Sequence, residues 1–142
     1  MKYLPLLLIF LFASCSIIKE ASKLKAPKFA KGQFMDDYGI KYEINDSTWV
    51  QNGKTKYNIL KWNIKEGYLI AQNDSNNKYD AGLFTRIDFI KLDDMNPFLW
   101  GFCLSAYKAK DIEEAMNPKN IDVKNPKKGC NGYPFSRMKK IN

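Results

Sequence analysis

The sequence predicts an all-β fold: an antiparallel meander of about seven or eight short strands forming a small barrel or barrel-like sandwich, with one short helix before the last strand. From Gly32 onward, apolar and polar residues alternate with a period of two, as in strands with one buried face. Clusters of Asn, Asp and Gly interrupt the alternation at short intervals, as expected of tight turns. Closure into a barrel would leave these short strands without free edges.

The first half of the predicted domain contains three clear strands. Residues 40–44 and 48–51 alternate cleanly, and Asn52-Gly53 then favours a two-residue hairpin because both residues tolerate a positive φ. The strand at 57–64 changes its apolar phase in the middle, which predicts a β-bulge or a strand buried on both faces.

The second half adds the remaining strands, which we expect at residues 68–71, 83–92, 98–107 and 133–138. Strand 98–107 is rich in aromatic residues, which gather on one face. The short helix is expected at 111–116, since Asp111 and Glu114 have the spacing of a capping box.

The amino-terminal segment has the features of a secretion signal. Lys2 supplies a positive charge, and the apolar run from Leu4 to Phe12 is shorter than the about 20 residues that a membrane-spanning helix needs. The stretch Phe12-Ala13-Ser14-Cys15 resembles the lipobox of bacterial lipoproteins, with Phe12 in place of the usual Leu. An ordinary signal peptide followed by a chance cysteine is the alternative interpretation.

This resemblance implies a localisation and a division of the chain. Residues 1–14 would be removed, Cys15 would carry the lipid, residues 15–28 would form a tether, and residues 29–142 would form the β domain. The protein would then be anchored in the cell envelope through the lipid on Cys15. Ser16 does not resemble the usual inner-membrane retention residue, which favours the outer membrane.

Composition excludes several classes of function. The chain has no histidine, which removes the commonest general base and the commonest zinc ligand. The net charge of +8 comes mostly from scattered lysines, so we expect no nucleic-acid partner. Asp74, Asn76 and Asp80 could offer oxygen atoms to calcium, but Lys78 lies among them and no distal Glu follows. We therefore predict no metal site, no cofactor and no catalytic residue.

Two cysteines remain after lipidation of Cys15. An even pair in an exported protein indicates a disulfide, here between Cys103 and Cys130. The alternative is two free thiols.

The predicted domain resembles the lipocalin-like small barrels found among bacterial lipoproteins. The resemblance depends on Gly32-Gln33-Phe34 at the first strand, the following Asp37-Tyr38-Gly39, and Arg137 near the last strand. In lipocalins a Trp occupies the place of Phe34 and packs against a late Arg, and the helix follows the last strand. The resemblance implies a barrel and a small apolar ligand. Stretches 69–73, 85–88 and 129–135 are also similar to bacterial exported proteins without an assigned activity.

Two non-enzymatic functions are favoured, and a hydrolase that uses only carboxylates is the third and least favoured alternative. In the first, the domain is a binding module for a small apolar ligand. The side chains that would line its cavity are Trp49, Trp62, Phe98, Trp100 and Phe102. In the second, the same side chains fill the core and the domain contacts a protein partner. Arg86 and Asp88 lie two residues apart on one strand face, and we expect a structural ion pair there.

Overall fold

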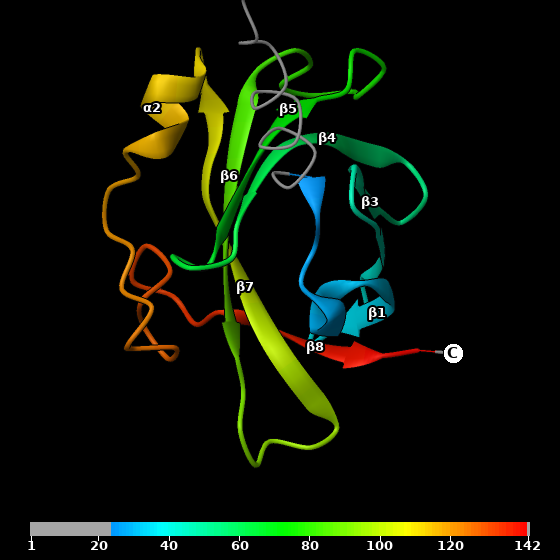
Figure 1. Cartoon of the computed structure of the whole chain (residues 1–142), viewed down its shortest axis with the longest axis vertical. Helices are drawn as coiled ribbons and strands as arrows, with labels where there is room; N and C mark the ends of the chain where they lie inside the picture. The colour runs from blue at the N-terminus through cyan, green and yellow to red at the C-terminus, as the bar shows by residue number, and fades with distance from the viewer. Residues whose placement is uncertain (1–23, 142) are drawn as a thin grey trace, which may run out of the picture.

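The computed structural model describes residues 24–141, in which eight antiparallel strands form a closed barrel (Figure 1). The strands are β1 (Gly32–Asp36), β2 (Lys41–Ile44), β3 (Thr48–Gln51), β4 (Thr55–Asn63), β5 (Tyr68–Asn73), β6 (Phe84–Lys91), β7 (Phe98–Ala109) and β8 (Ser136–Lys140). A short 3₁₀-helix, η2 (Lys28–Ala30), precedes β1, and helix α2 (Ile112–Met116) lies between β7 and β8. The predicted all-β barrel, with a short helix before the last strand, is confirmed.

The predicted signal at 1–14 and Cys15 lie outside the described residues, as does most of the tether predicted at 15–28. The end of that range is described and belongs to the domain, because the Ala26 amide donates to Asp46 Oδ1 at 2.9 Å. Within the described part of the chain, no helix is long and apolar enough to cross a membrane.

The local turn signals are realised in the structure. Asn52 and Gly53 have φ values of 50° and 65°, as the hairpin between β3 and β4 requires. At the start of α2, Asp111 Oδ1 accepts a hydrogen bond of 2.8 Å from the Glu114 amide. The Glu114 carboxylate accepts from the amide of Lys110, one residue before the helix cap, so the capping box is present in a slightly shifted form.

The predicted change of phase in the fourth strand is a β-bulge. The register of β4 on β5 shifts between Ile59 and Lys61, which leaves Leu60 as the extra residue. Strand β5 is buried on both faces, because the barrel interior covers one face and α2 covers the other.

The last strand begins later than predicted, at Ser136 rather than at Tyr133. Tyr133 pairs with Cys130 in an isolated bridge, and Pro134 has no amide hydrogen to donate to a ladder. Residues 117–135, which we call the strap, therefore run outside the barrel before β8 closes it.

Two ends of the barrel can be distinguished because consecutive strands are antiparallel. The turns at 52–54 and 74–83 lie together with the end of β7, and we call this end the mouth. The turns at 45–47 and 64–67 lie at the opposite end, which we call the floor. Helix η2 is tied to the floor, since the Lys31 ammonium contacts Asp46 at 2.9 Å.

The apolar side chains form two separate clusters. The larger cluster fills the interior of the barrel and includes residues from all eight strands and η2. The smaller one lies on the outer face, where Tyr68, Ile70 and Phe84 pack beneath Ala115 of α2. In Figure 1, α2 is seen outside the barrel beside β6.

Candidate functional site

Four of the five aromatic residues predicted to line a cavity lie inside the barrel. Trp49, Trp62, Trp100 and Phe102 are each at most 5% exposed and belong to the interior cluster. Phe98 does not, because the register of β7 on β8 shifts between Phe98 and Trp100 and interrupts the alternation of faces. The guanidinium of Arg137 instead lies over the Phe98 ring, 4.3 Å from its centroid.

The aromatic rings fill the barrel interior. Trp49 and Trp100 meet edge to face, with ring centroids 5.9 Å apart. Phe34 contacts Trp100 at 5.3 Å, and Phe102 contacts Trp49 at 5.1 Å, also edge to face. Such packing supports the filled-core alternative over an apolar cavity along the barrel axis. The resemblance to lipocalins would place Phe34 against Arg137. In the structure, Phe34 packs on the Trp100 ring, and Arg137 pairs with Asp37 through contacts of 2.9 Å.

The polar atoms inside are almost all satisfied. The Tyr42 hydroxyl donates to Asp36 Oδ2 at 2.8 Å, and burial followed by this hydrogen bond raises the Tyr42 pKa well above its ordinary value of 10. Asp36 Oδ1 also accepts from the amides of Tyr38 and Ile40. Within the described residues, the Trp100 indole nitrogen is the one buried side-chain polar atom that lacks a partner.

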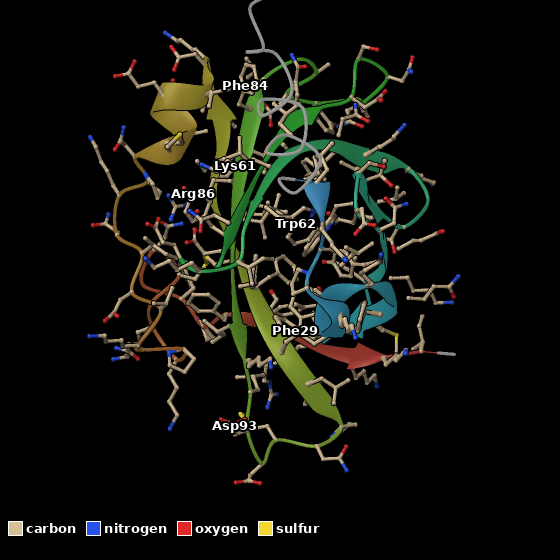
Figure 2. The ribbon with its side chains drawn as sticks, viewed as in Figure 1. Phe29, Lys61, Trp62, Phe84, Arg86 and Asp93 are labelled. Atoms are coloured by element: carbon tan, nitrogen blue, oxygen red, sulfur yellow. A yellow bond between two sulfur atoms is a disulfide. The ribbon has the colours of Figure 1, made fainter. Side chains whose placement is uncertain are left out.

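The floor of the barrel is closed by side chains from η2 and β4. Phe29 packs on Phe89 and Trp100, in each case with ring centroids 6.1 Å apart. Trp62 Nε1 donates to the Asp46 carbonyl at 2.8 Å, so its ring closes the gap between β4 and the turn at 45–47. Figure 2 labels Phe29 and Trp62 within the ring of strands.

The mouth, in contrast, holds an open pocket of about 240 Å³. Tyr57 and Leu104 line the inner part of this pocket. Its rim carries two exposed aromatic rings, those of Tyr79 (70% exposed) and Tyr107 (49% exposed). Its polar lining consists of Gln51, Thr55, Asn73, Asn77, Lys78 and Asp80.

The loop at 74–83 is held in place by its own asparagines. The side-chain nitrogen of Asn73 donates to the carbonyls of Asp80 and Tyr107 at 2.8 and 3.3 Å, and its side-chain oxygen accepts from the Thr85 hydroxyl. Asn77 pairs with both backbone groups of Lys56 at 2.8 and 2.9 Å. These bonds fix the pocket wall in position, so Tyr79 lies on an ordered loop.

The loop also contains Asp74, Asn76 and Asp80, the residues considered above for their oxygen atoms. Asp74 is engaged by Asn58 and by the Asn76 backbone, and these hydrogen bonds lower its pKa. Among residues 24–141, no group of three or more metal-ligating His, Cys, Asp or Glu side chains occurs.

Two groups at the mouth remain available to a ligand. Within the described residues, the Tyr57 hydroxyl and the Asp80 carboxylate take part in no side-chain hydrogen bond that ties them to the wall. Burial, and secondarily the Asp80 carboxylate, raises the pKa of Tyr57, so its hydroxyl is a protonated donor at neutral pH. The pocket thus presents a donor, a carboxylate acceptor and flat aromatic faces.

The predicted ion pair forms on the outer face of β6. Arg86 Nε and Nη2 contact the two Asp88 carboxylate oxygens at 2.9 and 2.8 Å. Asp88 also accepts from the Ser105 hydroxyl, and Arg86 lies 3.8 Å above the Tyr68 ring and donates to the Met116 carbonyl. Figure 2 shows Arg86 on the side of β6 that faces α2. This cluster attaches α2 to the barrel.

The Cys103–Cys130 disulfide is present in the structure and closes a loop over a sequence separation of 27. It fixes the strap to the outer face of β7.

The tyrosines of the mouth were not among the residues predicted to form a site. Tyr79 lies in a polar loop and Tyr57 and Tyr107 lie on distant strands, so only the closed barrel brings them together.

Comparison with known proteins adds no relative: no protein-family model, no curated protein and no solved structure matches this chain. The geometry of the mouth is therefore the basis for a functional proposal.

Proposed function

We propose that this protein is a lipid-anchored envelope protein whose β domain is a non-enzymatic binding module, with its ligand held at the mouth of the barrel. The observation that carries the proposal is the combination of a filled interior with an open, tyrosine-rimmed pocket of about 240 Å³ at one end. Surface pockets with a few convergent polar groups are the usual form of a small-molecule site.

The anchor is supported by two features of the chain. The stretch that ends in Cys15 resembles a lipobox, and the disulfide between Cys103 and Cys130 suits an oxidising compartment outside the cytosol. The chain enters the domain at the floor, so an anchor there would leave the mouth facing away from the membrane.

The ligand that fits the mouth is a small polar molecule with a flat apolar face, such as a sugar ring. The exposed faces of Tyr79 and Tyr107 can stack against ring C–H groups, while the Tyr57 hydroxyl and the Asp80 carboxylate can bond ring hydroxyls. A volume of 240 Å³ lies below the range of drug-sized pockets, which favours one ring or the end of a chain.

A purely binding role agrees with the arrangement of the acids. The buried carboxylates of Asp36 and Asp88 are occupied by Tyr42 and Arg86, respectively. Among the residues that line the pocket, Asp80 is the one carboxylate, and the chain has no histidine to act with it.

The test is a saccharide-binding screen on the chain without residues 1–15, which retains every strand. Binding of a sugar ligand is expected to weaken about twofold to tenfold for each of Tyr79→Ala and Tyr107→Ala, since an aromatic contact contributes about 0.5–1.5 kcal/mol. Tyr38→Ala and Tyr133→Ala are the matched controls, because these tyrosines are 75% and 73% exposed but do not line the pocket. Equal losses in both pairs would argue against a mouth site.

A protein-interaction role is the second candidate, favoured by the filled core. An apolar groove of about 500 Å³ lies between the β6–β7 turn and the strap, and it is lined by Leu92, Met95 and Phe135. If the saccharide screen finds no ligand, photocrosslinking from position 95 in the intact envelope would test this surface. A crosslinked protein partner would support the role, and its absence would leave it without support.

A further inference from the structure

We propose that the floor of the barrel is a docking surface for an anionic membrane, formed by a basic collar that consists of Lys28, Lys65 and Lys91 around an apolar groove. This inference is independent of the ligand at the mouth, because it concerns the opposite end of the domain. The surface that rests on this collar would be the headgroup layer of a bilayer that contains anionic phospholipid.

The first observation is the groove itself, whose volume is about 680 Å³. Its apolar surface comes from Phe29 of η2, Ile64 of the β4–β5 turn and Val123 of the strap. Ile64 and Val123 are 51% and 42% exposed, so apolar side chains face solvent at this end. Exposed apolar groups beside cations are characteristic of surfaces that rest at the boundary of headgroups and acyl chains.

The second observation is the charge around the groove. The lining includes three lysines and a single acid, Glu66, so it carries a net positive charge. Within the described residues, none of these three lysines takes part in a salt bridge, unlike Lys31 and Lys56. The Lys91 ammonium lies 5.2 Å from the centre of the Phe29 ring, which holds a cation beside the apolar surface.

The third observation is the position at which the chain enters the domain. Ala26 is bonded to Asp46 at the floor, and Leu24, 40% exposed, lies two residues before it. Whatever precedes Leu24 is therefore joined to the same end of the barrel as the collar. Charge, apolar exposure and attachment point all coincide at one end, whereas the mouth carries the polar pocket.

The test is vesicle co-sedimentation of the chain without residues 1–15, on phosphatidylcholine vesicles with and without one phosphatidylglycerol in three lipids. We expect binding only with the anionic lipid. Binding should also weaken as ionic strength rises from about 0.01 M to about 1 M, which shortens the screening length from about 30 Å to about 3 Å.

The variant Lys28→Gln/Lys65→Gln/Lys91→Gln removes the collar charge. Each lysine close to an anionic surface contributes a factor of about five, so this variant should bind about 100-fold more weakly. The matched control is Lys41→Gln/Lys54→Gln/Lys110→Gln, three exposed lysines near the mouth end. The control should bind as the unmodified chain does.

The thermal unfolding midpoints of both triple variants are compared first, and because all six lysines are exposed both variants should remain folded. Equal loss of affinity in the two triple variants would overturn the collar, since it would mean that only overall charge matters. Equal binding to the two kinds of vesicle would overturn the membrane as its occupant.

Discussion

Removing both members of the Arg86–Asp88 pair should cost less than the sum of the costs of removing each one alone. Asp88 is 2% exposed in its side chain and Arg86 is 13% exposed, and both Asp88 oxygens are bonded by the guanidinium. Arg86→Met leaves a buried carboxylate without its cation, and breaking a buried pair in this way costs about 3–5 kcal/mol. Asp88→Asn leaves the arginine charge unpaired, and we expect the lower end of that range because the guanidinium keeps some contact with water.

The double variant Arg86→Met/Asp88→Asn should be less destabilised than the sum of the single variants by at least about 1 kcal/mol, because no unpaired charge remains in it. The assay is urea denaturation followed by tryptophan fluorescence, with each variant measured at neutral pH. Arg86 also bonds the Met116 carbonyl, so hydrogen exchange of α2 should accelerate in both variants that lack it. Single variants that each cost less than about 1 kcal/mol and combine additively would show that Arg86 and Asp88 do not stabilise the fold as a buried ion pair.

Three further predictions concern the buried Tyr42, the disulfide and the proposed lipid anchor. Burial and the hydrogen bond to Asp36 raise the pKa of Tyr42. Above about pH 10 the Tyr42 hydroxyl therefore ionises in the unfolded chain but not in the folded one, and the unfolding free energy should fall. Below about pH 10 this group should not affect the unfolding free energy. Urea unfolding from about pH 8 to about pH 11 should show this fall to be smaller in Tyr42→Phe than in the unmodified chain. Reduction of the Cys103–Cys130 disulfide should lower the unfolding free energy by about 3.5 kcal/mol, measured by denaturation with and without a reductant. Cys15→Ser should move the expressed protein out of the membrane fraction, and its retention there would contradict the lipid anchor.

Much of the fold could be predicted from the sequence because its signals are local. The Asn52-Gly53 turn and the Asp111 cap depend only on neighbouring residues, and both are realised. The change of phase in β4 also has a local cause, the bulge at Leu60. Phe98 shows the limit of such reasoning: strict alternation places it beside Trp100, but a register shift against β8 separates them. That shift is a property of strand pairing and leaves no mark in the sequence of β7 alone.

The candidate site was harder to predict because it is assembled from separate elements. Tyr57, Tyr79 and Tyr107 are brought to one pocket by closure of the barrel and by the bonds of Asn73 to two different segments. In the sequence, the loop around Tyr79 indicates only a polar turn. The abundant aromatic residues predicted a core correctly, but composition does not distinguish rings that fill a barrel from rings that line a cavity.

A two-dimensional NMR titration with the sugar ligand from the screen shows whether ligands bind at the mouth of the filled barrel. The chain has three tryptophans, whose indole N–H signals report on the interior, and Trp100 is the most sensitive because its donor has no partner in the described structure. We predict ligand-induced shifts in the backbone signals of Tyr57, Tyr79 and Tyr107, with the indole signals unchanged. Large shifts of the Trp49 and Trp100 indole signals, with the mouth unaffected, would show that the ligand enters the interior and would contradict the account.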